Sequence, residues 1–317
     1  MDMEDRSHQP RIYYGWVLMA VAVIAGAFST GVGSWGAGVF ARPMTQALGW
    51  SRASYFGALT IRSLVAGVLA PFVGPLQDTR TGPRRLMLLS ALILGGSLIG
   101  ISYVNSLWQF YLLFGVLGGV AQVTGANALT RTILPKWFVR KRGRVLGLAS
   151  MGPGFGPMLF PVSLQAIMDI SGWRTTWMVL GIVSMAVLIP LSFLVRTRPE
   201  DMGLLPDGDP SPPEPEAAAT QQPQRMPQME GLTRKESIRA PSFWLIVVSF
   251  SFVTLGMGGF HSNLLPYFQD TGFTPAVAAL AATVFAICSV SVRPLWGFLA
   301  ERFSVRFLLG PQLILAA

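Results

Sequence analysis

The chain has 317 residues, of which 51% are hydrophobic and only 12% charged, and its formal net charge is +9. This composition lies far outside the usual range of soluble domains and predicts a membrane protein. The sequence contains no paired carboxylates, no cysteine or histidine cluster suited to a metal, no phosphate-binding loop and no nucleophile spaced to meet a base. We therefore expect no enzymatic activity, no metal and no cofactor.

Apolar stretches of about 20 residues, long enough to cross the hydrocarbon core of a bilayer, recur along the whole chain. They predict membrane-spanning helices near residues 15–40, 54–76, 86–104, 108–131, 145–168, 175–195, 242–268 and 274–299. A ninth apolar stretch begins near Arg306 and stops with the sequence at Ala317. The first stretch is much longer than the apolar region of a signal peptide, so we expect it to remain in the membrane. The predicted fold class is an all-α membrane protein.

Positive charges alternate between the connections that join the predicted helices. Connections two–three, four–five and six–seven are rich in Lys and Arg, whereas the alternate connections hold only Arg42, Arg52 and Arg174. Lys and Arg in short loops stay on the cytoplasmic side, so the amino terminus is expected to be cytoplasmic in a multi-pass protein of the cell membrane. Because the charges are divided among short loops, the basic composition does not indicate a nucleic-acid partner.

Residues 199–241 differ abruptly in composition from their surroundings. Prolines are interspersed there with acidic residues and glutamines, at Pro206, Pro210, Pro212, Pro213, Pro215, Pro223 and Pro227. Such a stretch buries little apolar surface, so it predicts a solvated linker between residues 1–198 and residues 242–317. A regulatory or partner-docking role for this linker remains an open alternative.

Two predicted helices end with the same signal. The second closes with Pro71-Phe-Val-Gly-Pro-Leu-Gln-Asp78, and the eighth closes with Pro294-Leu-Trp-Gly-Phe-Leu-Ala-Glu301. Both segments follow the pattern Pro-x-x-Gly-x-x-x-acid and fall at the predicted cytoplasmic face. A shift of six helices between equivalent segments predicts two halves in the same orientation, an internal repeat on which many secondary transporters are built.

The segment Gly74–Asp78, with Gly82, Arg84 and Arg85 after it, resembles the signature between helices two and three of the major facilitator superfamily. The spacing from Asp78 to Gly82 is four, one more than is usual in the family. The resemblance implies two six-helix halves, so this chain would hold a six-helix N-terminal half and an incomplete C-terminal half, about eight or nine transmembrane helices of an expected twelve. It also implies a gating role, which we assign to Gly74, Asp78, Arg80, Gly82, Arg84, Arg85, Gly297, Glu301 and Arg302. The alternative for the arginines is a simple positive-inside charge.

Two further stretches resemble the monocarboxylate transporters and the oxalate/formate antiporter group. They are residues 135–156, reading PKWFVRKRGRVLGLASMGPGFG, and Tyr13–Val17. In those relatives an arginine followed by proline lies near the substrate carboxylate on helix eight, and Arg293-Pro294 matches that pair. The acid that proton-coupled relatives carry four residues earlier is replaced here by Ser289, and their helix-one lysine is missing. Uniport, anion exchange and a different coupling ion therefore all remain open.

Three arginines fall within the predicted spans: Arg62, Arg131 and Arg293. Each charge costs about 2.5–3.5 kcal/mol near a helix centre on insertion scales, which makes such residues functional candidates. Arg62 precedes Gly74 by about 18 Å of helix, near or just outside the midplane. Arg293 could extend towards the cytoplasm, and Arg131 is expected at the interface. No Asp or Glu lies well inside a span, so the expected counter-ion is the substrate.

Polar side chains in the same helices complete the predicted binding site, although helix–helix contacts would explain each of them as well. The additional candidates are Gln122, Asn127, His261, Asn263 and, in the stretch where relatives carry the lysine, Trp35. His261 is also a candidate proton carrier, because imidazole titrates near physiological pH.

These observations favour a carrier that moves a small organic anion, a monocarboxylate or dicarboxylate, by alternating access. Its expected partners are this anion, the lipid bilayer, and a co-transported ion or an exchanged anion. Three alternatives remain open: a carrier of a sugar or drug, a membrane sensor that binds an anion without moving it, and a fragment that is inactive by itself.

Overall fold

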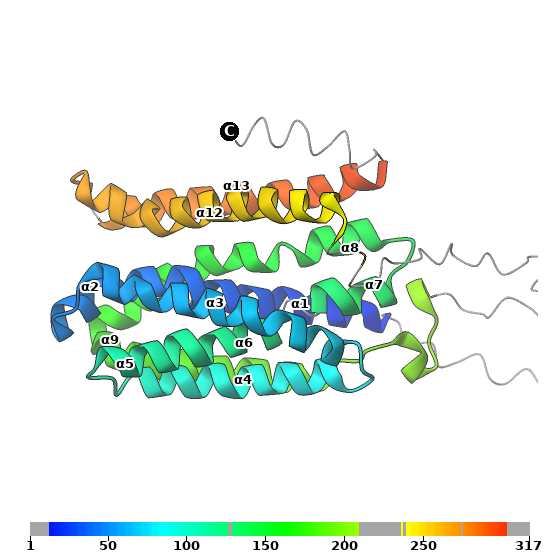
Figure 1. The fold of residues 1–317 in the computed structure, drawn as a ribbon, viewed down its shortest axis with the longest axis horizontal. Coiled ribbons are helices and arrows are strands. Elements are labelled where there is room, and N and C mark those ends of the chain that lie inside the picture. The colour runs from blue at the N-terminus through cyan, green and yellow to red at the C-terminus, as the bar shows by residue number, and fades with distance from the viewer. Residues whose placement is uncertain (1–12, 126–128, 209–235, 237–238, 274, 303–317) are drawn as a thin grey trace, which may run out of the picture. The chain divides into compact units, whose positions relative to one another are not determined.

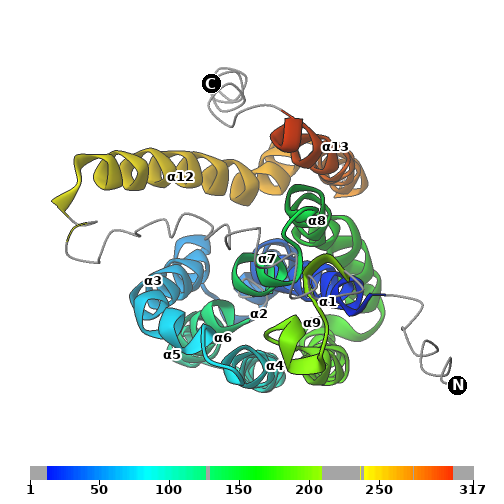
Figure 2. The ribbon, with the colours of Figure 1, turned by 90° about the vertical axis from the view of Figure 1, so that its right-hand side faces the viewer.

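The computed structural model describes residues 13–125, 129–208, 236, 239–273 and 275–302, and these form helices joined by short turns, with no strand among them (Figure 1). Two compact units are present: Met1–Gly208 together with Ala279–Ala317, and Asp209–Ala278. In the first unit, α9 lies against both α1 and α4, as the end-on view shows (Figure 2). The prediction of an all-α membrane fold is confirmed by these helices and by the structural comparison below.

The first predicted span is a continuous rod of 35 residues, Tyr14–Leu48. It consists of α1 (Tyr14–Thr30), a π-helical segment η1 (Gly31–Gly36) and α2 (Ala37–Leu48). Gly49 ends the rod in the left-handed conformation with φ of 68°, which a glycine adopts without strain. The rod therefore extends eight residues beyond residue 40, where the predicted stretch ends.

The second and third spans have sharp boundaries. α3 (Arg52–Gln77) begins at Ser51, whose hydroxyl accepts a hydrogen bond from the backbone N–H of Ser54 at 3.0 Å. It ends at Asp78, and α4 (Gly82–Ile101) follows after one short turn. A Cβ on Gly82 would lie 1.8 Å from the carbonyl oxygen of Leu76, so this turn requires glycine there.

The fourth span contains α5 (Leu107–Phe110), the π-helical η2 (Tyr111–Leu117) and α6 (Gly118–Thr124). It continues after residues 126–128, which lie outside the described residues, as η3 (Leu129–Ile133) and α7 (Leu134–Trp137). Residues 111–117 and 129–133 thus share the wider π-helical winding of η1.

The fifth and sixth spans together consist of α8 (Arg142–Ala149) and the 43-residue α9 (Gly152–Leu194). Gly172, with φ of 76°, interrupts α9 and marks the point where the fifth predicted span ends and the sixth begins. The seventh and eighth predicted spans correspond to α12 (Pro241–Asp270) and α13 (Pro275–Arg302). The ninth apolar stretch lies outside the described residues.

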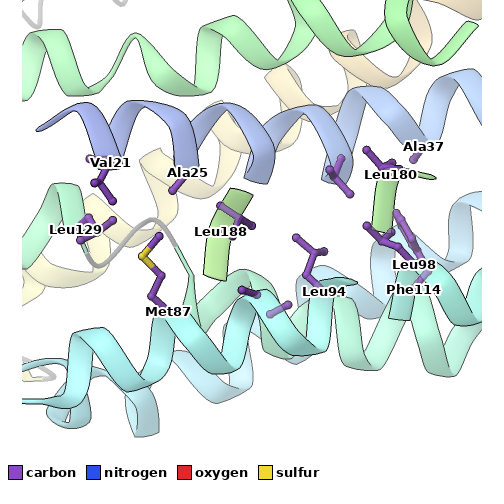
Figure 3. Close-up of a cluster of buried hydrophobic side chains, with 14 of the residues drawn as sticks. Val21, Ala25, Ala37, Met87, Leu94, Leu98, Phe114, Leu129, Leu180 and Leu188 are labelled. Carbon is purple, nitrogen blue, oxygen red and sulfur yellow. The ribbon is translucent and has the colours of Figure 1, made fainter. Parts of the chain in front are cut away.

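The buried core of the first unit is aromatic and aliphatic. Phe40 of α2 stacks on Trp177 of α9 with 3.8 Å between ring centres, and Tyr55 of α3 stacks on Phe110 at 5.0 Å. Side chains of α1, α4 and α9 meet in the interior shown in Figure 3. Burial of such side chains fixes the helices around one central region, where the candidate site lies.

The first ten residues of the predicted linker, 199–208, are among the residues that the structure describes. They form two short 3₁₀ helices, η4 (Pro199–Met202) and η5 (Pro206–Gly208), and belong to the first unit. The hydroxyl of Tyr13 donates to the carbonyl oxygen of Leu205 at 3.1 Å, a partly buried contact that connects this segment to the start of the first span. Residues 209–235 lie outside the described residues, and the boundaries 1–198 and 242–317 stay predictions.

Candidate functional site

Arg62 lies in the interior of the first unit, with only 5% of the residue exposed. Its Nε donates to Oε1 of Gln122 in α6 at 2.9 Å. Its Cζ lies 5.2 Å from the centre of the Phe114 ring in η2, a cation–π distance. The structure therefore brings together two residues that the sequence singled out, Arg62 and Gln122, and adds Phe114.

The guanidinium of Arg62 has N–H donors for which the structure describes no hydrogen-bond acceptor. Among the described residues, Nε is the only nitrogen of Arg62 that donates a hydrogen bond to another side chain. No described carboxylate lies within ion-pair distance of the guanidinium. The Nη1 and Nη2 groups form the planar fork that matches a carboxylate in bidentate fashion. An interior cation with free donors is costly unless a ligand supplies the acceptors.

A small cavity of about 20 Å³ lies beside Arg62, with room for about one water molecule. Its polar lining includes Arg62, Gln122 and Ser90. The Ser90 hydroxyl donates to the carbonyl oxygen of Ala121 at 2.7 Å. Its apolar wall is visible in Figure 3, where Ala25, Met87, Leu94 and Leu188 lie around one interior region. The complete lining comprises Ala25, Ser29, Arg62, Met87, Ser90, Leu94, Ala121, Gln122, Gly125 and Leu188.

The other predicted binding residues are placed differently. Arg293 of α13 is partly buried and donates through Nη1 to the carbonyl oxygen of Ser150, at the end of α8. Arg131 of η3 is exposed and does not line the cavity. Trp35 of η1 is buried. Asn127 lies outside the described residues, as do the side chains of His261 and Asn263.

Sequence reasoning did not single out Phe114, Ser29, Ser90 or Gly33 for the site. A Cβ on Gly33 would lie 2.7 Å from Nη2 of Arg62. The aromatic and serine residues carry no distinguishing sequence signal, because their place depends on how spans one, three and four pack. The close spacing of glycines in span one was the signal that could have identified Gly33 as a contact point.

The residues predicted for gating gather where α3 ends and α4 begins. Asp78 pairs with Lys136 of α7 at 3.3 Å, and Arg80 pairs through Nε with Asp201 of η4 at 2.9 Å. The Cζ of Arg84 lies 5.0 Å from the centre of the Phe193 ring. The partner of Asp78 is therefore a lysine from the end of the fourth span.

For the remaining gating candidates other than Gly82, the structure describes no ion pair or close contact. A Cβ on Gly74 would meet no described atom within 4 Å, so no close helix contact is described there. Arg85 is exposed. Gly297, Glu301 and Arg302 belong to α13, but the structure does not describe their surroundings, so their roles stay predictions.

Asp207 makes a second polar centre at the same end of the bundle. Its carboxylate accepts from the backbone N–H groups of Val139, Arg140 and Lys141, at 3.0, 2.8 and 3.4 Å. Its side chain is only 4% exposed, and its φ of 61° is the one positive value of a non-glycine residue in the described chain. Consecutive backbone N–H groups of this kind form an anion-binding concavity. We call Asp207 with these three N–H groups the Asp207 anchor.

Tyr13 lies beside the Asp207 anchor, with its ring next to Gly208. Its hydroxyl donates to the carbonyl oxygens of Trp137 at 2.9 Å and Leu205 at 3.1 Å. Burial, followed by the nearby negative charges of Asp207 and Glu200, raises the pKa of Tyr13 to about 12. The phenol is therefore a neutral hydrogen-bond donor at physiological pH.

Comparisons with known proteins show which proteins the chain is similar to. The chain is 26% identical to monocarboxylate transporter 11 of Homo sapiens over 237 residues, 73% of this chain and 45% of that protein. It is 33% identical to multidrug resistance protein MdtG of Proteus mirabilis (strain HI4320) over 141 residues, 44% of this chain and 34% of that protein. The chain therefore spans less than half the length of either relative.

A solved structure shares the fold. The crystal structure of a D-xylose-proton symporter matches 92% of this chain and 70% of its own, with a TM-score of 0.63 and 14% sequence identity. The family model of the Major Facilitator Superfamily matches residues 23–317. The predicted resemblance is thereby confirmed, and the chain belongs to the Major Facilitator Superfamily of membrane transporters.

Proposed function

We propose that the protein is a secondary transporter of a small organic anion, a monocarboxylate or dicarboxylate, which it binds through Arg62. The observation that carries this proposal is the interior guanidinium, which lies beside a cavity and has no carboxylate partner among the described residues. A substrate carboxylate would supply the missing charge and accept hydrogen bonds from Nη1 and Nη2.

Arg293 is proposed as a second cation for the same anion. It lies one residue before Pro294, as the arginine of the monocarboxylate group does. Its bond to the Ser150 carbonyl occupies Nη1 and leaves other N–H groups available for a ligand. Two cations would suit a dicarboxylate, whereas one would serve a monocarboxylate.

Competition for uptake tests the substrate class. Proteoliposomes that contain the complete protein should take up a labelled monocarboxylate, and unlabelled carboxylates should compete while sugars and cationic drugs should not. Competition by a sugar or drug but not by carboxylates would overturn the anion proposal, and the relationship to MdtG makes a drug the main rival. Carboxylate binding without uptake would instead identify a sensor.

The same vesicles resolve the coupling mode. Uptake that increases with an imposed inward proton gradient indicates symport, and uptake that requires an internal anion indicates exchange. His261 as the proton carrier predicts that His261→Gln removes the effect of the gradient while facilitated entry remains.

A further inference from the structure

The guanidinium of Arg62 rests directly on the backbone of span one at Gly33. A Cβ built on Gly33 would lie 2.7 Å from Nη2, 3.0 Å from Cζ and 3.1 Å from Nη1. All three atoms belong to the part of Arg62 that would bind a carboxylate. Every residue other than glycine would therefore collide with the group that we propose as the anion receptor.

Arg62 has little freedom to avoid such a collision. Its side chain is buried, Nε is held by Gln122 and the guanidinium lies over the Phe114 ring. Gly118, on the same span as Phe114, also approaches Arg62, with 3.6 Å between an added Cβ and Cδ. Span four therefore confines Arg62 on one side, and Gly33 forms the surface on the other.

The backbone on both sides of Arg62 is π-helical. Gly33 lies in η1 and Phe114 lies in η2. π-Helical turns contain an extra residue, are rare, and occur frequently at functional sites. Two such turns in different spans, both in contact with one buried arginine, form a shaped recess for its guanidinium.

We propose that Gly33 is a positioning residue that determines how far the Arg62 fork extends into the cavity and thus how well it binds the substrate carboxylate. This inference rests on the proposed role of Arg62 in anion transport. Gly33 contributes no donor itself, and its effect is transmitted through the guanidinium. A methyl group at this position moves the fork away from its bidentate geometry, which weakens charge-assisted hydrogen bonds that depend on alignment.

The test is a double-mutant cycle on KM for uptake of a labelled monocarboxylate by the complete protein in proteoliposomes. Gly33→Ala in the native background should raise KM by about tenfold or more, with a smaller change in kcat. In the Arg62→Lys background the same change should alter KM by about twofold or less, because lysine lacks the Nη fork that meets the added methyl. Gly38→Ala is the matched control, since a Cβ at Gly38 meets nothing within 4 Å.

A KM increase that is the same in both backgrounds would overturn the inference, because a general packing defect does not depend on the fork. An unchanged KM in Gly33→Ala would overturn it as well. If Arg62→Lys transports too slowly for the cycle, melting temperatures of the purified variants replace KM. A loss on Gly33→Ala that disappears with Arg62→Lys supports the contact, and an additive loss rejects it.

Failure of the proposed function gives a different result. Normal uptake by Arg62→Gln would show that Arg62 is not the anion receptor. Loss of uptake in Arg62→Gln, together with a harmless Gly33→Ala, would leave the receptor in place and reject only the role of Gly33.

Discussion

The interior around Arg62 and the end of the bundle around Asp207 differ in whether a cation has a carboxylate partner within the chain. At the bundle end, Lys136 pairs with Asp78 and Arg80 pairs with Asp201, so these two cations have carboxylate partners in the same chain. In the interior, Arg62 has an amide and an aromatic ring as neighbours and no described carboxylate. The charges at the bundle end join segments of the protein, whereas the charge of Arg62 is the one that we propose binds a ligand.

The difference also appears in how each region obtains its shape. The Asp207 anchor satisfies three backbone N–H groups with one carboxylate and connects the start of the linker to the connection between spans four and five. The Arg62 site is made by close helix packing and π-helical turns that leave a small cavity. The N–H groups of the Asp207 anchor are all used within the protein, whereas Nη1 and Nη2 of Arg62 have no described hydrogen-bond partner.

The largest expected effect is from Arg62→Gln, which keeps hydrogen-bonding groups and removes the charge. Uptake of a labelled monocarboxylate should fall by about a hundredfold or more, because a buried charge-assisted bidentate contact is lost. Membrane insertion, checked by yield and by size-exclusion chromatography, should be retained. The matched control is Arg42→Gln, an exposed arginine near the end of the first span, which should transport normally.

Replacing Arg293 should have the second largest effect. Arg293→Gln is expected to raise KM for a dicarboxylate about tenfold or more and for a monocarboxylate less, if the second carboxylate binds there. Arg293→Lys keeps the charge and should retain most of the affinity. Equal loss in the glutamine and lysine variants would show that the bond to Ser150, and not the charge, is what matters.

The Asp207 anchor should matter for stability more than for substrate affinity. Asp207→Gly keeps a φ of 61° accessible and removes the carboxylate, so the free energy of unfolding should fall by about 1–3 kcal/mol. Asp201→Ala breaks an ion pair whose arginine is 77% exposed, and should cost less than about 1 kcal/mol. Thermal unfolding of the two purified variants compares them, and equal losses would mean that the anchor is no stronger than a surface pair.

The smallest expected effect concerns the titration of Tyr13. The pKa of its phenol is about 12 instead of 10, so the neutral form is favoured in the folded protein. Its stabilising contribution is complete below about pH 10 and is lost as the pH rises through about 12. The difference in tyrosinate absorbance between the native protein and Tyr13→Phe isolates this group. In Asp207→Gly the midpoint should move down, because one of the raising charges is gone; a midpoint that stays unchanged would remove Asp207 as a cause.

Much of this arrangement could be predicted from the sequence. Apolar length located the spans, because the bilayer imposes a fixed minimum on each helix. The cost of an interior charge identified Arg62, and its partner Gln122 was on the list of polar candidates for the same reason. These inferences use properties of single residues and of continuous stretches, which a sequence displays directly.

What the sequence could not predict depends on contacts between distant segments. Phe114 and Gly33 reach Arg62 only because spans one, two and four meet, and the extra residue of a π turn has no reliable sequence signal. Residues 199–208 were assigned to the solvated linker on proline content, whereas Tyr13 and the 139–141 backbone bind them. Local composition does not display such tertiary hydrogen bonds, so the sequence could not predict these contacts.

Direct binding of a labelled monocarboxylate to the purified protein tests the central claim most closely. The native protein should bind it saturably, Arg42→Gln should bind it with the same affinity, and Arg62→Gln should show no saturable binding. Equal affinity in the native protein and in Arg62→Gln would contradict the claim that the interior guanidinium is the receptor for the anion.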